Sequence, residues 1–92
     1  FSPEDGKEIK CEVPIIGVLD NEAISARIDL LVIKKDEILI VDYKTDKITS
    51  GDIPESYSNQ LKTYENLVKK IYKTRVRTAI LWVEDFKLDF LP

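Results

Sequence analysis

The sequence predicts an α/β (α+β) fold in which a helix packs on a mixed β-sheet. Two kinds of pattern support this fold: runs rich in Val and Ile, which favour strands, and one stretch with apolar residues at three- and four-residue spacing, which favours a helix. The expected strands are residues 11–19, 23–34, 37–44, 75–83 and 86–91, and the expected helix is residues 54–73. With 92 residues, this order suits one small domain.

The first expected strand begins at Cys11 and contains Pro14. Because proline donates no ladder hydrogen bond, Pro14 indicates an edge strand or a bulge. We expect Cys11 to be buried as a small apolar side chain. Asp20 and Asn21 favour a turn, so the chain should reverse there into the second strand.

The second and third strands, 23–34 and 37–44, are separated by a short polar link, so we expect a β-hairpin. If the loop consists of Lys35 and Asp36, or is symmetric about them, paired residues have numbers that sum to 71. A three- or five-residue loop would shift the pairing by one position.

The first of these registers brings charged residues together across the hairpin. Asp29 then lies opposite Asp42, and Arg27 lies opposite Lys44. Facing side chains have their Cβ atoms about 5 Å apart. Two carboxylates this close repel, so a divalent cation with oxygen ligands suits the space between them. The shifted register would instead turn one acid away.

The third strand ends in Asp42, Tyr43 and Lys44. Because a strand alternates its faces, Asp42 and Lys44 point the same way as Ile38 and Ile40. Charges are rarely buried unless they are paired or bind a metal. We therefore predict the edge of an active site at the end of this strand.

The expected helix begins at Pro54, a residue favoured in a first turn, with Asp52 or a neighbour as its cap. Glu65 and Lys69 should form an i,i+4 pair on its exposed side. The loop before the helix, residues 45–53, is either the border of a substrate groove or a plain connection. The side chains expected to face the sheet are Tyr57, Leu61, Tyr64, Leu67, Val68 and Ile71.

The composition excludes several classes of site. The chain has no histidine, which removes histidine bases and histidine metal ligands, and its one cysteine excludes an internal disulfide and a cysteine-ligated iron–sulfur cluster. The net charge of −3 does not predict nucleic-acid binding, and no apolar run of about 18 residues predicts a membrane span. The chain also lacks methionine, so we expect it to be a piece of a longer protein.

The ordered motifs resemble those of a known family. Asp29 in RIDLL, then Asp42 and Lys44 in IVDYKTD, then Gln60 and Tyr64 in QLKTY, resemble the PD-(D/E)XK nuclease superfamily and its RecB-like branch. Within that branch, the chain resembles the C-terminal nuclease domain of AddA-type helicase–nucleases. A lone DxK is a weak signal, whereas the ordered set in matching elements is specific.

The resemblance covers residues 11–92 and implies a restriction-endonuclease-like core, truncated at its N-terminal helix. Residues 1–92 would form a single nuclease domain fragment of a longer helicase–nuclease chain. The implied activity is Mg²⁺-dependent (or Mn²⁺-dependent) DNA exonuclease hydrolysis in double-strand break repair and recombination. The implied partners are DNA and an AddB-type subunit, with no membrane, in the bacterial cytoplasm.

The resemblance also implies a role for each motif residue. Asp29 and Asp42 would bind the metal ion together with the backbone carbonyl of Tyr43. Lys44 would orient or activate the attacking water and stabilise the phosphate charge. The catalytic residues would be Asp29, Asp42, Lys44 and Gln60, and the residues that support the site and the DNA would be Gln60, Tyr64 and Arg27.

Departures from the family pattern leave an alternative open. Ala26 and Leu30 stand where the family often has a glycine and a basic residue. RecB-like nucleases also use a histidine on an upstream helix, which this chain lacks, and this fits truncation before that helix or a degenerate site. The alternative is a degenerate nuclease fold that binds DNA or docks a subunit. In a purely structural interpretation, the two acids and Lys44 would form an ion-pair cluster with Arg27, and Glu12 would be a structural charge.

Overall fold

A computed structural model describes residues 8–45 and 53–91, and its elements follow the order that the sequence predicts. The strands are β1 (Glu8–Leu19), β2 (Glu22–Ile33), β3 (Glu37–Lys44), β4 (Arg75–Trp82) and β5 (Lys87–Phe90), and the helix is α1 (Glu55–Tyr72). The strands form one sheet in the order β1-β2-β3-β4-β5. Because β3 and β4 run parallel while the other neighbouring pairs run antiparallel, the expected mixed sheet is confirmed.

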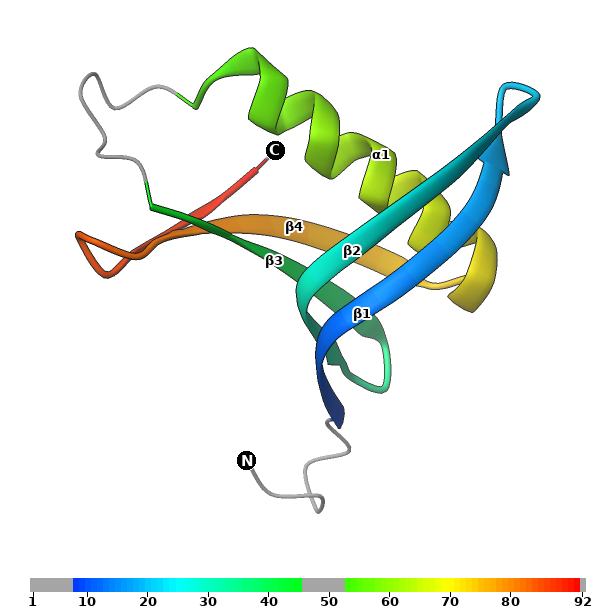
Figure 1. Cartoon of the computed structure of the whole chain (residues 1–92). Coiled ribbons are helices and arrows are strands. Elements are labelled where there is room, and N and C mark those ends of the chain that lie inside the picture. Colours follow the sequence, from blue (N-terminus) through cyan, green and yellow to red (C-terminus); the bar gives the residue numbers. More distant parts are fainter. Residues whose placement is uncertain (1–7, 46–52, 92) are drawn as a thin grey trace.

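The helix α1 joins the parallel strands β3 and β4 and lies over one face of the sheet (Figure 1). Two parallel strands need such a crossover connection. The apolar stripe of α1 packs on the sheet and forms the core with it. The largest fully buried side chains are Ile28, Leu31, Ile38, Ile40, Leu61, Leu67, Val68 and Ile80. The prediction for Ile71 was wrong, because this side chain near the end of α1 is 54% exposed. Within the described chain, no helix combines the length and apolar character needed to cross a membrane.

The ends of α1 are set by backbone geometry. Pro54 is the N-cap residue, and no side-chain hydrogen bond caps this end. Lys73 adopts the left-handed conformation at the C-cap, and its N–H donates to the carbonyl of Lys69 at 2.9 Å. The predicted pair between Glu65 and Lys69 is present at 3.1 Å. The expected cap Asp52 lies outside the described residues, as does most of the loop before the helix.

The hairpin between β2 and β3 has the register that the two-residue loop predicts. Ile33 pairs with Ile38, and the ladder continues to Leu30 and Val41. The backbone N–H of Lys34 donates to the carbonyl of Glu37 at 2.8 Å, which closes the loop. The positions of the acids on β2 and β3 are therefore fixed relative to one another by this tight turn.

The strands β1 and β2 bend together halfway along their length (Figure 1). The ladder between β1 and β2 is continuous on both sides of this point, but Glu12 and Asp29 are not paired with each other. Glu12 has a φ of 51°, which is uncommon for a residue with a side chain. This local interruption resembles a bulge in its effect, because it bends the strands and releases Asp29 from regular pairing with β1.

The prediction that Cys11 is buried was wrong, because its side chain is exposed. Cys11 pairs with Leu30, which pairs with Val41 on β3. Paired residues share one face of a sheet, and Val41 points away from Ile40, which packs in the core under α1. Cys11 therefore lies on the face that α1 does not cover. The position of Pro14 in an edge strand is confirmed, since β1 is the first strand of the sheet.

The outer half of the β1–β2 hairpin packs against α1. Lys70 donates from Nζ to the carbonyl of Val18 at 2.7 Å. A β-carbon added at Gly17 would lie 2.6 Å from Cδ2 of Leu67, whose side chain is 2% exposed. Glycine at this position therefore allows the strand to approach the helix closely.

We predict that Gly17→Val destabilises the fold by about 1–3 kcal/mol, because the new side chain must displace the buried Leu67. Denaturant unfolding followed by the fluorescence of Trp82 measures this loss. The control Ile16→Val lies on the same strand at a position that is 77% exposed, and it should change stability by less than about 0.5 kcal/mol. Adding Leu67→Ala should make the cost of Gly17→Val smaller, and a cost that is unchanged would contradict this account.

Candidate active site

The charged end of β3 is organised around Asp42, whose side chain is buried with 5% of the residue exposed. Strand alternation places it on the same face as Ile38 and Ile40, which belong to the core under α1. Lys44 follows on this face and brings its Nζ within 2.9 Å of Asp42 Oδ2. The ammonium lowers the pKa of the Asp42 carboxyl, against the opposing effect of burial. The buried carboxylate is thus balanced by a neighbouring opposite charge.

Asp29 reaches the same place from β2. The ladder between β2 and β3 ends at Leu30 and Val41, one pair before the expected pair of Asp29 with Asp42. Instead, Asp29 accepts a hydrogen bond at Oδ2 from the backbone N–H of Tyr43, at 2.9 Å. The side chain of Asp29 thus links β2 to β3 beyond the last backbone pair. This hydrogen bond holds the carboxylate of Asp29 against β3, the strand that carries Asp42.

The two acids are close enough to influence each other's ionisation. Burial raises the pKa of Asp42, the neighbouring Lys44 ammonium lowers it, and the neighbouring Asp29 carboxyl raises it again, so that the net shift is upward. The contact of Asp29 with the backbone of Tyr43, the residue after Asp42, agrees with this mutual influence. The two acids therefore lie near one another at the end of the β2–β3 ladder.

The helix α1 contributes Gln60 and Tyr64 to the same cluster. Lys44 donates from Nζ to Gln60 Oε1 at 3.0 Å, and Gln60 donates from Nε2 to the hydroxyl oxygen of Tyr64 at 2.8 Å. The single orientation of the Gln60 amide satisfies both contacts, with its oxygen toward the ammonium and its nitrogen toward the phenol. The spacing of four residues between Gln60 and Tyr64, one helical turn, makes this arrangement possible.

Tyr57 is a member of the cluster that the sequence assigned only to packing. The Lys44 ammonium lies over its ring, with Nζ 4.3 Å from the ring centroid. This distance is within the range of cation–π contacts. The only available signal in the sequence was an aromatic residue one turn before Gln60 on the same helix, which also fits a core position.

A family model described as the PD-(D/E)XK nuclease superfamily matches residues 2–88. The chain belongs to this superfamily. A search of curated proteins gives no match. Both the superfamily that the ordered motifs resemble and the restriction-endonuclease-like fold class are thus confirmed for this PD-(D/E)XK chain, and membership supports a nuclease, a hydrolase of phosphodiester bonds.

The acid pair of the PD-(D/E)XK chain has the chemistry of a site for a hard divalent cation. Asp42 presents a buried carboxylate, and the carboxylate of Asp29 is held nearby by the backbone N–H of Tyr43. No group of three or more metal-ligating side chains occurs in residues 8–45 and 53–91. Mg²⁺ commonly binds through one or two carboxylates and keeps several waters, so two acids suffice for its protein ligands. The carbonyl of Tyr43 as a further ligand stays a prediction.

Arg27 does not join the acids. It is exposed and pairs with Pro14 on β1, and the ladder between β2 and β3 ends before Arg27 could face Lys44. The expected juxtaposition of Arg27 with Lys44 is therefore wrong, because the bend at Glu12 carries this half of β2 away from β3. The ion pair of Lys44 is made with Asp42. A role of Arg27 in DNA support stays a prediction.

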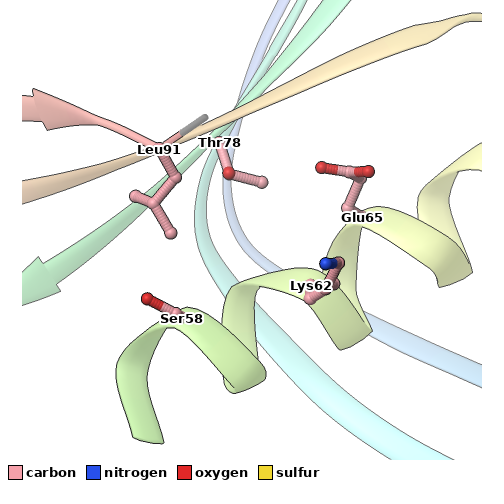
Figure 2. Close-up of a pocket in the computed structure, with 5 residues that line it drawn as sticks. All are labelled: Ser58, Lys62, Glu65, Thr78 and Leu91. Atoms are coloured by element: carbon pink, nitrogen blue, oxygen red, sulfur yellow. The ribbon is translucent and has the colours of Figure 1, made fainter. Parts of the chain in front are cut away.

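A pocket of about 120 Å³ lies elsewhere on the molecule, between α1, β4 and the residue after β5 (Figure 2). Its lining residues are Ser58, Lys62, Glu65, Thr78 and Leu91. Helical spacing puts Ser58, Lys62 and Glu65 on the opposite margin of the buried stripe from Gln60. The pocket contains none of the residues that converge on Asp42, so we assign the candidate active site to the acid cluster on chemical grounds.

We predict that Mn²⁺ raises the thermal midpoint of the metal-free protein, because a ligand that binds only the folded state stabilises it. At ten times its Kd the gain is about 1.4 kcal/mol, or about 5–10 °C for a domain of this size. The double variant Asp29→Asn/Asp42→Asn should lose the shift. Asp36→Asn, in the exposed hairpin loop, is the matched control and should keep it. An equal Mn²⁺ shift in the double variant would remove the metal assignment.

Proposed function

We propose that the chain is the metal-dependent DNA exonuclease domain of an AddA-type helicase–nuclease. The observation that carries this proposal is the placement of Asp29, held by the backbone of Tyr43, near the buried pair of Asp42 with the Lys44 ammonium. Hydrolysis of a phosphodiester needs compensation of the charge that develops on the phosphate and a means of activating water. Two acids that bind a divalent ion, next to a fixed ammonium, supply both.

The AddA-type assignment is supported by sequence resemblance. The segments SARIDLLVI and ILIVDYKT, the helix SYSNQLKTYENLVKKIY and the closing AILWVEDFKLDFLP resemble the C-terminal nuclease domain of these proteins in the same order. On this proposal, the substrate is DNA at a double-strand break and the partner is an AddB-type subunit. The proposed setting is the bacterial cytoplasm, where repair and recombination take place.

In the proposed mechanism, Asp29 and Asp42 hold the divalent ion. When bound, Mg²⁺ or Mn²⁺ supplies Lewis-acid stabilisation of the phosphate and promotes ionisation of water. The buried position of Asp42 matters here, because its carboxylate is held by β3 and does not need to be ordered during the reaction. The hydrogen bond from the backbone of Tyr43 holds Asp29 in the same way.

Lys44 contributes a positive charge at a fixed point. Its ammonium is held by Asp42 on one side and by Gln60 on another, at 2.9 Å and 3.0 Å. From this position it stabilises negative charge on the phosphate and orients the attacking water. Gln60 is in turn held by Tyr64, so the helix α1 determines where the ammonium lies.

The alternative is a degenerate nuclease fold that binds DNA or docks a subunit. It would be favoured by acids that diverge across the sheet or by a lysine remote from them. Here the acids approach one another and Lys44 contacts Asp42, which supports the enzyme over the alternative.

We predict that Asp42→Ala or Lys44→Ala abolishes Mg²⁺-dependent DNA degradation by the full-length protein and spares ATP-driven unwinding. Each variant removes one partner of the buried pair, so thermal unfolding should confirm that the variant is folded before its activity is compared. The assay compares digestion of linear DNA with and without EDTA. Lys34→Ala, in the loop between β2 and β3 and remote from Lys44, is the control and should retain activity. Undiminished digestion by either site variant would refute the nuclease assignment.

A further inference from the structure

Lys44 is bounded on a third side by an aromatic ring. Its Nζ lies 4.3 Å from the ring centroid of Tyr57, while Asp42 and Gln60 occupy the other two sides. The Lys44 side chain is 18% exposed, so the ammonium is partly shielded from water. A cation–π contact strengthens under such desolvation.

The ring of Tyr57 is itself braced from the sheet. Its centroid lies 6.1 Å from that of Trp82, with an interplanar angle of 43°. Trp82 is the pairing partner of Lys44 on β4, so both side chains share the face beneath Tyr57. The indole of Trp82 is 2% exposed and donates from Nε1 to Asp89 Oδ2 on β5, at 2.8 Å. The packing thus runs without interruption from β5 through Trp82 and Tyr57 to the ammonium.

We propose that Tyr57 is a positioning residue whose ring face, braced by Trp82 and Asp89, holds the Lys44 ammonium at the catalytic edge. The inference rests on the proposed nuclease function and adds a residue to its machinery. Tyr57 acts through Lys44 and does not contact the substrate in this assignment.

A neutral ring has a property that a second carboxylate in its place would lack. A divalent ion held by Asp29 and Asp42 would share the charge of Asp42, and the attraction of Asp42 for Lys44 would then weaken. A further acid beside Lys44 would compete for the same ion. The face of an aromatic ring attracts an ammonium without presenting oxygen ligands, so it holds the cation and leaves the metal site to Asp29 and Asp42.

The first test compares Tyr57→Phe with Tyr57→Leu in the full-length protein. Tyr57→Phe keeps the ring and should retain kcat, whereas Tyr57→Leu should lower kcat about tenfold with little change in KM, the equivalent of about 1.4 kcal/mol. Tyr72→Leu, an aromatic substitution at the exposed end of the same helix, is the control and should retain full activity. Equal losses in the phenylalanine and leucine variants would overturn the proposal, since they would assign the effect to the hydroxyl.

The second test preserves the size of the side chain. Phenylalanines with one, two and three ring fluorines at position 57 weaken the attraction of the ring for a cation stepwise without opening a cavity. The expected result is a kcat that falls with each fluorine, and a flat series would overturn the proposal. This series remains decisive where Tyr57→Leu does not fold.

A third measurement needs neither metal nor activity. In the metal-free protein, the ring current of Tyr57 should shift the NMR signals of the Lys44 Cε protons upfield, and Tyr57→Leu should abolish the shift. Unshifted signals in the unmodified protein would overturn the contact. The outcomes separate the two hypotheses: an active Lys44→Ala variant refutes the nuclease assignment, whereas an inactive Lys44→Ala with a fully active Tyr57→Leu refutes only the role of Tyr57.

Discussion

The burial of the Asp42 carboxylate is the constraint on which the site depends. A charge in this position is costly unless an opposite charge accompanies it. Lys44 provides that charge because the two-residue period of a strand returns to the same face after one intervening residue. The long lysine side chain must then be held, and α1 holds it through Gln60 and Tyr57. The need of Asp42 for a counter-charge therefore links the end of β3 to α1 through the contacts of Lys44.

A second constraint determines where Asp29 lies. Regular pairing on both sides would have kept β2 straight between β1 and β3, with the acid held in the ladder. The positive φ of Glu12 interrupts the pairing of β1 with β2 at this point. The residues of β2 that precede Leu30 do not pair with β3. Asp29 then completes the hydrogen bonding of Tyr43 with its own carboxylate. A backbone irregularity thus frees a strand residue from the ladder and re-aims its side chain, as bulges beside active sites often do.

The sequence predicted those features that depend on local periodicity and tight turns. The two-residue loop of Lys35 and Asp36 predicted the hairpin register, and this register is observed as far as the pair of Leu30 with Val41. It did not predict the features that depend on long-range geometry. Nothing about Glu12 identifies a left-handed backbone, so the bend, and with it the separation of Arg27 from the acids, could not be foreseen. The cation–π role of Tyr57 was likewise hidden, because an aromatic at that helical position satisfies the core pattern equally well.

The environment of Asp42 disfavours the charged form of its carboxyl group. Burial and the carboxyl of Asp29 both raise the pKa of Asp42, and the ammonium of Lys44 offsets this only in part. Arg27 lies close in sequence and could have neutralised the pair, yet the bend directs it elsewhere. Replacing a buried ion pair with apolar side chains of similar size often stabilises a protein, so stability alone does not explain the pair of Asp42 with Lys44. The bend therefore leaves Lys44 as the cation that contacts the buried carboxylate, and it keeps the guanidinium of Arg27 out of the candidate site.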